Sequence, residues 1–220
     1  MSDSTHLLLV RHGETVGNLE KIAHGQTESP LNDRGIEQAK HTAEMLREWE
    51  RVYHRVYTSP MSRANQTGRH IADALQLPID THEHLKEGNL GDWEEVTYQE
   101  LEEFGFAKHS IRDDDFRGHN GESPNQLGTR VAGAVSELRG RHPTENLIVV
   151  SHGAAIAHLI ARLLGTQPAF GHQYLMHNAA VTELSFSADS TPELVTLNFH
   201  KHLPDHLIVH PVRRDKNVRK

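Results

Sequence analysis

Two short apolar runs, each ending in a histidine followed by glycine, constrain this chain more than any other feature. Leu7–Val10 is followed by Arg11 and His12, and residues 146–151 (NLIVVS) are followed by His152. Runs of this length, bounded by polar residues, are typical of buried strands. Because α/β sheets place active sites at the carboxyl ends of their strands, we expect both histidines at one edge of the same sheet. A single His-Gly could be an ordinary loop feature, but the pair indicates a site.

The rest of the chain alternates helical with extended patterns. Apolar spacing and capping residues predict helices over residues 32–51, 62–75 (or from 60), 97–104, 123–141 and 154–164. Further strands are predicted at 54–58, 180–187 and 194–199. Alternation of this kind predicts a three-layer α/β/α sandwich with a mainly parallel sheet.

The length of the chain fits one domain. We expect that domain to occupy residues 1–200. Residues 201–220 form a basic tail, and its last part, 213–220, has the composition of a disordered segment. The stretch from 83 to 120 is irregular and acidic, and it is expected to pass over the active edge of the sheet.

Composition excludes several classes of protein. The apolar runs are too short to span a bilayer, and the N-terminal one is too short for a signal peptide, so we expect a cytoplasmic protein. A net charge of −7 argues against a general binder of nucleic acid or anionic membranes. The absence of cysteine excludes a thiol nucleophile and thiolate metal sites. The 19 histidines are interpreted as a histidine-rich surface rather than a pH switch or metal store, since no metal-binding helix motif accompanies them.

Two arginines near the predicted site suit a phosphate group. Arg11 precedes His12, and Arg63 lies at the start of the helix predicted from residue 62. A guanidinium offers paired donors that match phosphate oxygens, and the positive end of a helix would add to their attraction.

Five ordered segments resemble the signature of the histidine phosphatase superfamily, the phosphoglycerate mutase-like group. They are 8–18 (LLVRHGETVGN), 25–32 (GQTESPLN), 57–64 (YTSPMSRA), 85–94 (LKEGNLGDWE) and 149–153 (VVSHG). The resemblance covers residues 6–187, and five motifs in order are far more specific than any one of them.

The resemblance implies a division of roles. His12 would be the nucleophile that forms a phosphohistidine, while Arg11, Arg63 and His152 would surround the equatorial oxygens. Glu87 would protonate the leaving group and then take a proton from water. From the residues alone, Glu87 could equally be a solvated acid of an acidic loop. No metal and no other cofactor is implied.

The resemblance also implies substrate contacts at Asn18, Gly25, Gln26 and Asn178. Taken alone, Asn178 could be a simple turn asparagine. The chain departs from the family in one place, because many relatives have Trp-Glu-Gly where this sequence has Trp-Glu-Glu at 93–95. A backbone turn that uses glycine there is expected to be shaped differently.

The sequence favours hydrolysis over mutase activity. Cofactor-dependent mutases of the family carry an adjacent arginine pair between the acid segment and the second histidine, and 104–120 has none. The favoured function is therefore a phosphomonoester hydrolase for a small phosphorylated metabolite. A phosphoglycerate mutase and a catalytically idle binding protein are the alternatives, and a homodimer is an oligomeric state that the family allows.

The same segment is predicted to cover the leaving group. Its four apolar side chains could form a wall of the pocket, or they could pack locally under a loop: Phe104, Phe106, Ile111 and Phe116.

Overall fold

The central feature of the fold is a six-stranded sheet. The computed structural model describes residues 4–110, 112–187 and 191–209, with strand order β3-β2-β4-β1-β5-β6. The strands are β1 (Thr5–Arg11), β2 (Arg55–Thr58), β3 (Ile79–Thr81), β4 (Leu147–Ser151), β5 (Val181–Phe186) and β6 (Glu193–Phe199). The first four are mutually parallel, whereas β5 and β6 run antiparallel to their neighbours. The sheet is therefore mainly parallel, as predicted.

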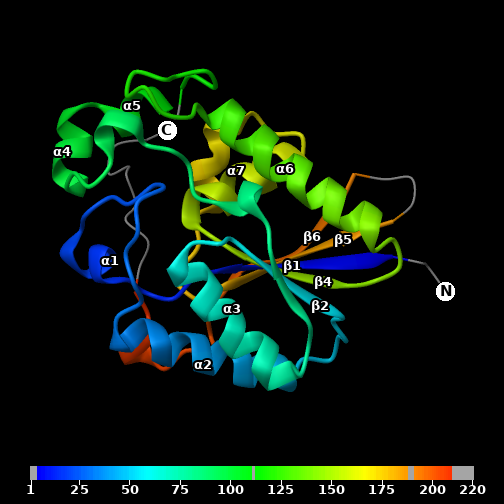
Figure 1. Cartoon of the computed structure of the whole chain (residues 1–220). Coiled ribbons are helices and arrows are strands. Elements are labelled where there is room, and N and C mark those ends of the chain that lie inside the picture. The colour runs from blue at the N-terminus through cyan, green and yellow to red at the C-terminus, as the bar shows by residue number, and fades with distance from the viewer. Residues whose placement is uncertain (1–3, 111, 188–190, 210–220) are drawn as a thin grey trace.

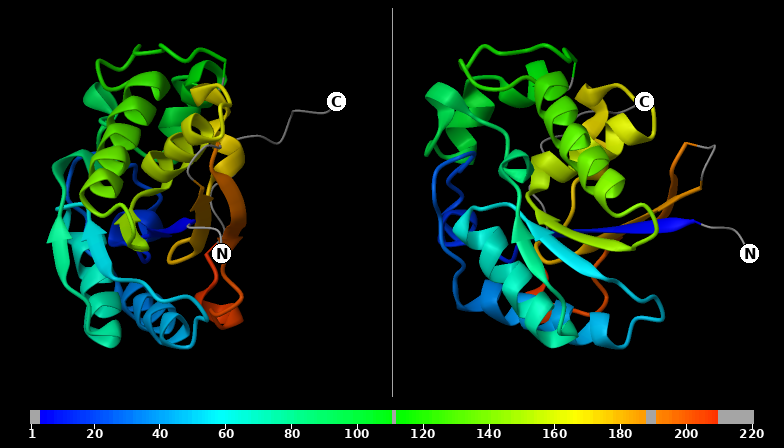
Figure 2. Two further views of the ribbon diagram at one scale, coloured as in Figure 1. Left: turned by 90° about the vertical axis from the view of Figure 1, so that its right-hand side faces the viewer. Right: turned by 45° about the vertical axis from the view of Figure 1, so that its right-hand side comes forward.

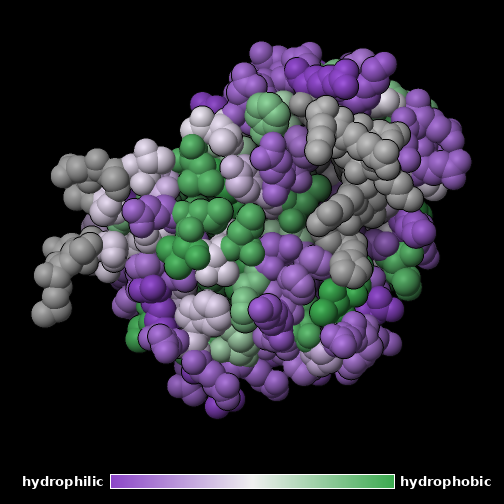
Figure 3. Space-filling view, turned by 180° about the vertical axis from the view of Figure 1, so that it is seen from behind, coloured by the Kyte–Doolittle hydropathy of each residue, from purple (hydrophilic) through white to green (hydrophobic). Residues whose placement is uncertain are grey.

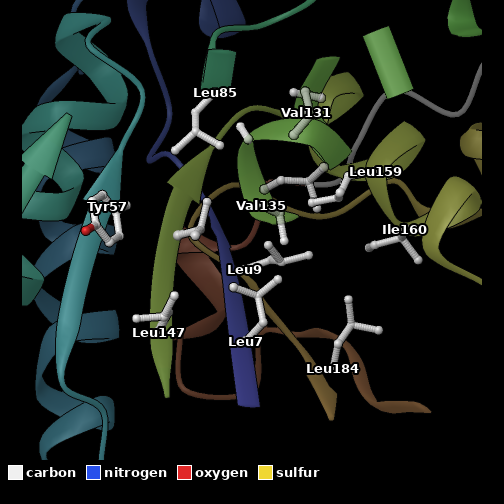
Figure 4. Packing of buried hydrophobic residues seen from close by; sticks show 14 of the residues in the cluster. Leu7, Leu9, Tyr57, Leu85, Val131, Val135, Leu147, Leu159, Ile160 and Leu184 are labelled. Carbon is white, nitrogen blue, oxygen red and sulfur yellow. The ribbon is translucent and has the colours of Figure 1, made fainter. Parts of the chain in front are cut away.

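Alternate residues of β1 supply two hydrophobic cores. Leu7 and Leu9 face one core, which includes side chains of α6 (Pro124–Arg141) and α7 (Gly153–Leu163) (Figure 4). Leu8 and Val10 face the other core. A strand covered on both faces must be apolar at every position, which explains the unbroken run that marks β1.

Two helix pairs enclose the sheet and complete the three-layer sandwich. α2 (Asp33–Arg47) and α3 (Ser62–Leu75) cover one face, and α6 and α7 cover the other (Figures 1 and 2). The predicted fold class is confirmed.

The helix predicted over 32–51 ends earlier, at Arg47, so its last turn was wrong. Side chains beyond that point make contacts elsewhere: the Trp49 ring packs edge-on against Phe199, and Arg51 Nε lies 2.5 Å from Glu183 Oε1. These tertiary contacts outweigh the helix propensity of residues 48–51.

Short elements beyond the carboxyl end of β1 escaped prediction. They include α1 (Val16–Glu20), α5 (Phe106–Ser110), and the one-turn 3-10 helices η1 (Glu83–Leu85) and η2 (Gly91–Trp93), in addition to the expected α4 (Tyr98–Glu103). In Figure 1, α1, α4 and α5 lie together on the left, past the end of β1. The segment from 83 to 120 therefore passes over this edge of the sheet, as expected.

The residues after β6 pack against α2. Leu203 and Leu207 are buried, Gln38 Nε2 donates to the carbonyl of Leu207, and His202 Nε2 lies 3.0 Å from Thr42 Oγ1. Residues 201–209 are thus in contact with the sandwich, while the boundary drawn at residue 200 stays a prediction. The segment 213–220, predicted to be disordered, lies outside the described residues.

The sheet ends at β6 on one side. Val195 and Leu197 of this strand are exposed, and hydrophobic side chains gather left of centre in the view from behind (Figure 3).

Within the described ranges, no helix has the length and apolar character to cross a membrane. The homodimer stays a prediction.

Candidate active site

The parallel pairing of β1 and β4 brings the two histidines together. Arg11 pairs in register with Ser151, so the next residues, His12 and His152, leave the sheet side by side. Their ring centroids are 5.1 Å apart, with an angle of 63° between the rings. The prediction that both histidines share one edge of the sheet is confirmed.

His12 has one ring nitrogen committed and one with an available lone pair. Nδ1 lies 2.7 Å from the carbonyl oxygen of Gly13, which can only accept, so Nδ1 carries the proton. Burial, together with the charges of Arg63 and Arg11, holds the pKa of His12 well below 6.5. The ring is therefore neutral at physiological pH, and the lone pair is on Nε2.

His152 is completely buried and is neutral as well. Arg63 Nε donates to its Nδ1 over 3.1 Å, so Nε2 carries the proton and donates to Ser59 Oγ over 2.8 Å. Burial and then the charge of Arg63 hold its pKa well below 6.5. A phosphate oxygen bound by His152 Nε2 would take the place of Ser59. The phosphate contact of His152 stays a prediction.

Arg63 is fixed by neutral partners. Besides His152, its guanidinium donates to the carbonyls of Thr27 over 3.0 Å and of Gly25 over 2.8 Å. The side chain is buried, and burial lowers its pKa. Because these partners carry no charge, the cation is oriented without being neutralised by them.

Arg11, the residue before His12, has a donor to spare. Its Nη1 donates to the carbonyl of Met176 over 2.6 Å, while its buried Nε has no hydrogen-bond partner within the part of the chain that the structure describes. A Cβ at Gly153 would lie 3.3 Å from this Nε, a closer contact than most Cβ atoms make. The glycine after His152 therefore admits the guanidinium closely.

Glu87 is held against the start of α7 instead of lying free in an acidic loop. Its Oε1 accepts from the amides of Ala155 (2.8 Å) and Gly88 (2.9 Å), and its Oε2 accepts from Ala154 (3.0 Å). Its charge also acts on both Arg11 and Arg63. The carboxyl group thus lies near the arginines, and its role as proton donor stays a prediction.

Carboxylates occupy three of the amides at the N-termini of α3 and α7. The Ser62 amide of α3 donates to the carboxylate of Glu28, and the Ala154 and Ala155 amides of α7 donate to Glu87. Side chains distant in sequence satisfy these amides, and a contribution of the positive end of α3 to phosphate binding stays a prediction.

Asn18 and Asn178 form a chain of amides beside His12. Asn178 Nδ2 donates to the carbonyl of His12 over 3.2 Å and to Asn18 Oδ1 over 3.1 Å. Asn18 Nδ2 in turn lies 3.4 Å from the hydroxyl of Tyr98. Asn178 is therefore part of the site's framework, and sequence reasoning missed Tyr98, whose position depends on how α4 folds over α1. Direct contact of both asparagines with substrate stays a prediction.

Gly25 and Gln26 have their amides bound to Glu94. The two N–H groups donate to the carboxylate oxygens of Glu94 over 2.7 and 2.8 Å. Their contact with substrate stays a prediction, and the structure gives them a second connection that the sequence did not reveal.

The turn after Trp93 takes the glycine conformation without a glycine. Glu95 has a φ of 61°, in the left-handed region that side chains avoid. This residue adopts the strained conformation that a glycine would adopt freely, and a shape different from that of the relatives' turn stays a prediction.

The aromatic residues of the 83–122 segment gather around Trp93. Its ring centroid lies 5.4 Å from that of Phe104, 5.8 Å from Phe106 and 6.1 Å from Phe116. This arrangement favours local packing over a wall for the leaving group. Ile111 lies outside the described residues.

No group of three or more potential metal ligands occurs within residues 4–110, 112–187 and 191–209. Two neutral histidines accompanied by the buried Arg63 and the half-buried Arg11, at the carboxyl edge of an α/β sheet, suit a phosphoryl-transfer enzyme. A nucleophilic nitrogen and fixed cations are what that reaction requires.

Comparison with known proteins agrees with this class. The profile of the histidine phosphatase superfamily (branch 1) matches residues 7–200. An uncharacterised phosphatase of Bacillus subtilis is 31% identical over 199 residues, covering 90% of this chain and 97% of that protein. A metal-independent phosphoserine phosphatase of Arabidopsis thaliana is 35% identical, covering 74% of this chain and 70% of that protein. Probable phosphoglycerate mutases also match.

Solved structures show the same fold. Phosphoserine phosphatase from Entamoeba histolytica, in complex with 3-phosphoglyceric acid, superposes with a TM-score of 0.81 at 29% identity. The match covers 91% of this chain and all of that one. The protein belongs to the histidine phosphatase superfamily, and it is an enzyme of that family.

Proposed function

We propose that the protein hydrolyses the phosphomonoester of a small phosphorylated metabolite through a phosphohistidine at His12. The observation that carries this proposal is the state of His12: a neutral ring whose Nδ1 is bonded to Gly13, with the Nε2 lone pair available and the charges of Arg11 and Arg63 nearby. A neutral imidazole is the nucleophilic form, and the two cations suit the charge of a transferring phosphoryl group.

In the first step, the Nε2 lone pair of His12 attacks phosphorus in line. A nitrogen–phosphorus bond forms while the bond from phosphorus to the leaving oxygen breaks. Glu87, protonated at that moment, gives its proton to the leaving oxygen. The alcohol departs, and Arg11, Arg63 and His152 hold the phosphoryl oxygens.

In the second step, water attacks the phosphohistidine. The carboxylate of Glu87 takes a proton from the water, an oxygen–phosphorus bond forms, and the nitrogen–phosphorus bond breaks with its electron pair returning to His12. Inorganic phosphate leaves, and Glu87 is again protonated. No step requires a metal ion, because the charge of the phosphoryl group is met by the arginines.

Transfer to water is favoured over transfer to a second organic phosphate. The segment that covers the site carries Arg112 and Arg117 apart from one another, and Arg117 Nε is bonded to the carbonyl of Gly121. The resemblance associates mutase activity with an adjacent arginine pair that holds a doubly phosphorylated ligand, since a guanidinium binds phosphate oxygens in pairs. A cytoplasmic location is part of the same proposal, in keeping with a metabolite as substrate.

The test is phosphate release from para-nitrophenyl phosphate, phosphoserine, 3-phosphoglycerate and other metabolite phosphates, with EDTA present. His12→Ala should lower the rate by at least about 10⁴-fold, as expected for loss of a nucleophile. His206→Ala, at an exposed histidine, is the matched control and should retain full activity. Release that survives in His12→Ala contradicts the nucleophile, and mutase activity on 3-phosphoglycerate without release supports the alternative.

A further inference from the structure

Glu94 lies where two segments around the site meet. Its half-buried carboxylate accepts four hydrogen bonds: from the amides of Gly25 (2.7 Å), Gln26 (2.8 Å) and Leu90 (3.0 Å), and from the hydroxyl of Thr27 (3.2 Å). Three of these donors belong to residues 25–27 and one to the segment that carries Glu87. The side chain therefore joins two parts of the chain that are more than 60 residues apart in sequence.

The first of these segments orients Arg63. The carbonyls of Gly25 and Thr27 accept hydrogen bonds from the two terminal nitrogens of its guanidinium, and its Nε donates to Nδ1 of His152. Since the amides of Gly25 and Gln26 are bound to Glu94, a shift of the carboxylate would move the carbonyls that direct the guanidinium. Glu94 thus acts on Arg63 through the main chain.

The second segment carries the acid. Gln26 Nε2 donates to the carbonyl of Glu87 over 3.0 Å, and the Leu90 amide is bound to Glu94 itself. The two segments touch so closely that a Cβ at Gly25 would lie 2.4 Å from both Glu94 Oε1 and the carbonyl of Gly88. Any residue other than glycine at position 25 would therefore push one of the two segments away from the other. The contact fixes the spacing between Arg63 and Glu87.

Only a carboxylate suits this position. Every partner of the side chain is a donor, and a carboxylate offers acceptors alone. A glutamine would turn an NH₂ group toward one set of donors and lose their bonds. The negative charge also acts on Arg63, and so helps to keep that buried cation charged.

We propose that Glu94 is a positioning residue, which sets the placement of Arg63 and Glu87 relative to the reacting phosphoryl group. The proposal rests on the proposed function of His12 as nucleophile. Glu94 touches neither substrate nor the reacting atoms, and it acts through residues 25–27 and 87–90. Its loss should therefore change the stabilisation of the transition state for every substrate.

The test compares Glu94→Gln with Glu95→Gln, the same change at the exposed neighbouring residue. Glu94→Gln should lower kcat on para-nitrophenyl phosphate by about 10–100-fold, since displacement of a group by about 1 Å costs that much. The loss on phosphoserine should be larger, because a poor leaving group also needs Glu87. The inhibition constant for vanadate, a transition-state mimic, should rise at least about tenfold. Glu95→Gln should leave all three unchanged.

A merely structural role would lower the fraction of folded protein and leave vanadate inhibition of the remaining enzyme unaltered. That result, or equal behaviour of the two variants, would overturn the proposal. If Glu94→Gln does not fold, Glu94→Asp keeps the charge with a shorter reach and should show smaller changes in the same directions. Absence of His12-dependent phosphate release from the unaltered protein overturns both proposals, whereas normal release with no effect at Glu94 overturns this one alone.

Discussion

The floor and the roof of the site are built in different ways. The floor consists of Arg11, His12, Arg63 and His152, which follow or flank buried strands and are held by the sheet. The roof is the segment 83–122, which carries Glu87 and Glu94 and consists of short helices and turns. The strands beneath the floor are held by two apolar cores, whereas Glu87 and Glu94 of the roof are held by hydrogen bonds to main-chain amides.

This difference suggests a division of labour. Phosphate has the same geometry in every substrate, so a rigid buried floor can serve all of them. Leaving groups differ, and a roof of short elements can vary without disturbing the cores beneath it. We therefore expect changes in the floor to affect all substrates alike, and changes in the roof to depend on the leaving group.

Apart from loss of the nucleophile, the largest effect should come from Arg63→Lys in the floor. A lysine cannot reach His152 and the carbonyls of residues 25 and 27 together, and it has no planar fork for phosphate. kcat/KM should fall by about 10²–10³-fold on para-nitrophenyl phosphate and phosphoserine alike. Arg69→Lys, exposed on the same helix, should change neither rate. A loss that depends strongly on the leaving group would break the distinction between floor and roof.

A smaller and selective effect is expected from Glu87→Gln in the roof. Glutamine cannot give a proton to the leaving oxygen, so kcat on phosphoserine should fall by about 10²-fold. Para-nitrophenolate leaves without a proton, so its release should slow far less. Glu83→Gln, at an exposed acid of the same segment, is the control. Equal losses on both substrates would remove Glu87 from the role of acid.

The smallest effect concerns the stability of the folded protein and involves His202. The Nε2 of His202 lies 3.0 Å from Thr42 Oγ1, and Thr42 Oγ1 donates to the carbonyl of Ala179. Burial lowers the pKa of His202 from 6.5 to about 4. Between these values the unfolded chain binds more protons than the folded one, so the free energy of unfolding decreases as the pH falls below 6.5.

From pH 7 to pH 5, His202 alone should remove about 2 kcal/mol of stability. Urea unfolding at the two pH values measures this loss. His202→Gln should lose about 2 kcal/mol less than the unaltered protein over the same interval, and His206→Gln, at an exposed histidine, should behave like the unaltered protein. An identical pH dependence in all three proteins would exclude His202 as the source.

Prediction from sequence succeeded where the signal was local in the chain. Apolar runs predicted the buried strands. Ser123 and Pro124 predicted the start of α6, where Ser123 forms a capping box with Gln126 and Pro124 lies in the first turn. It failed for β3, whose three residues have no recognisable period and form a strand only by pairing with β2. It also failed at the end of α2, because Trp49 contacts Phe199 of β6 and Arg51 contacts Glu183 of β5.

The sequence by itself determined the family, the class of fold, and the presence of His12 and His152 at one edge of a sheet, because strand runs and ordered motifs need no knowledge of distant contacts. Only the tertiary structure decided how the site is held. The bond from Arg63 to His152, the amide chain from Asn178 to Asn18, and the three bonds from residues 25–27 to Glu94 join residues far apart in sequence. Such contacts leave no periodic or local mark, since the folding of the sheet and of the roof creates them.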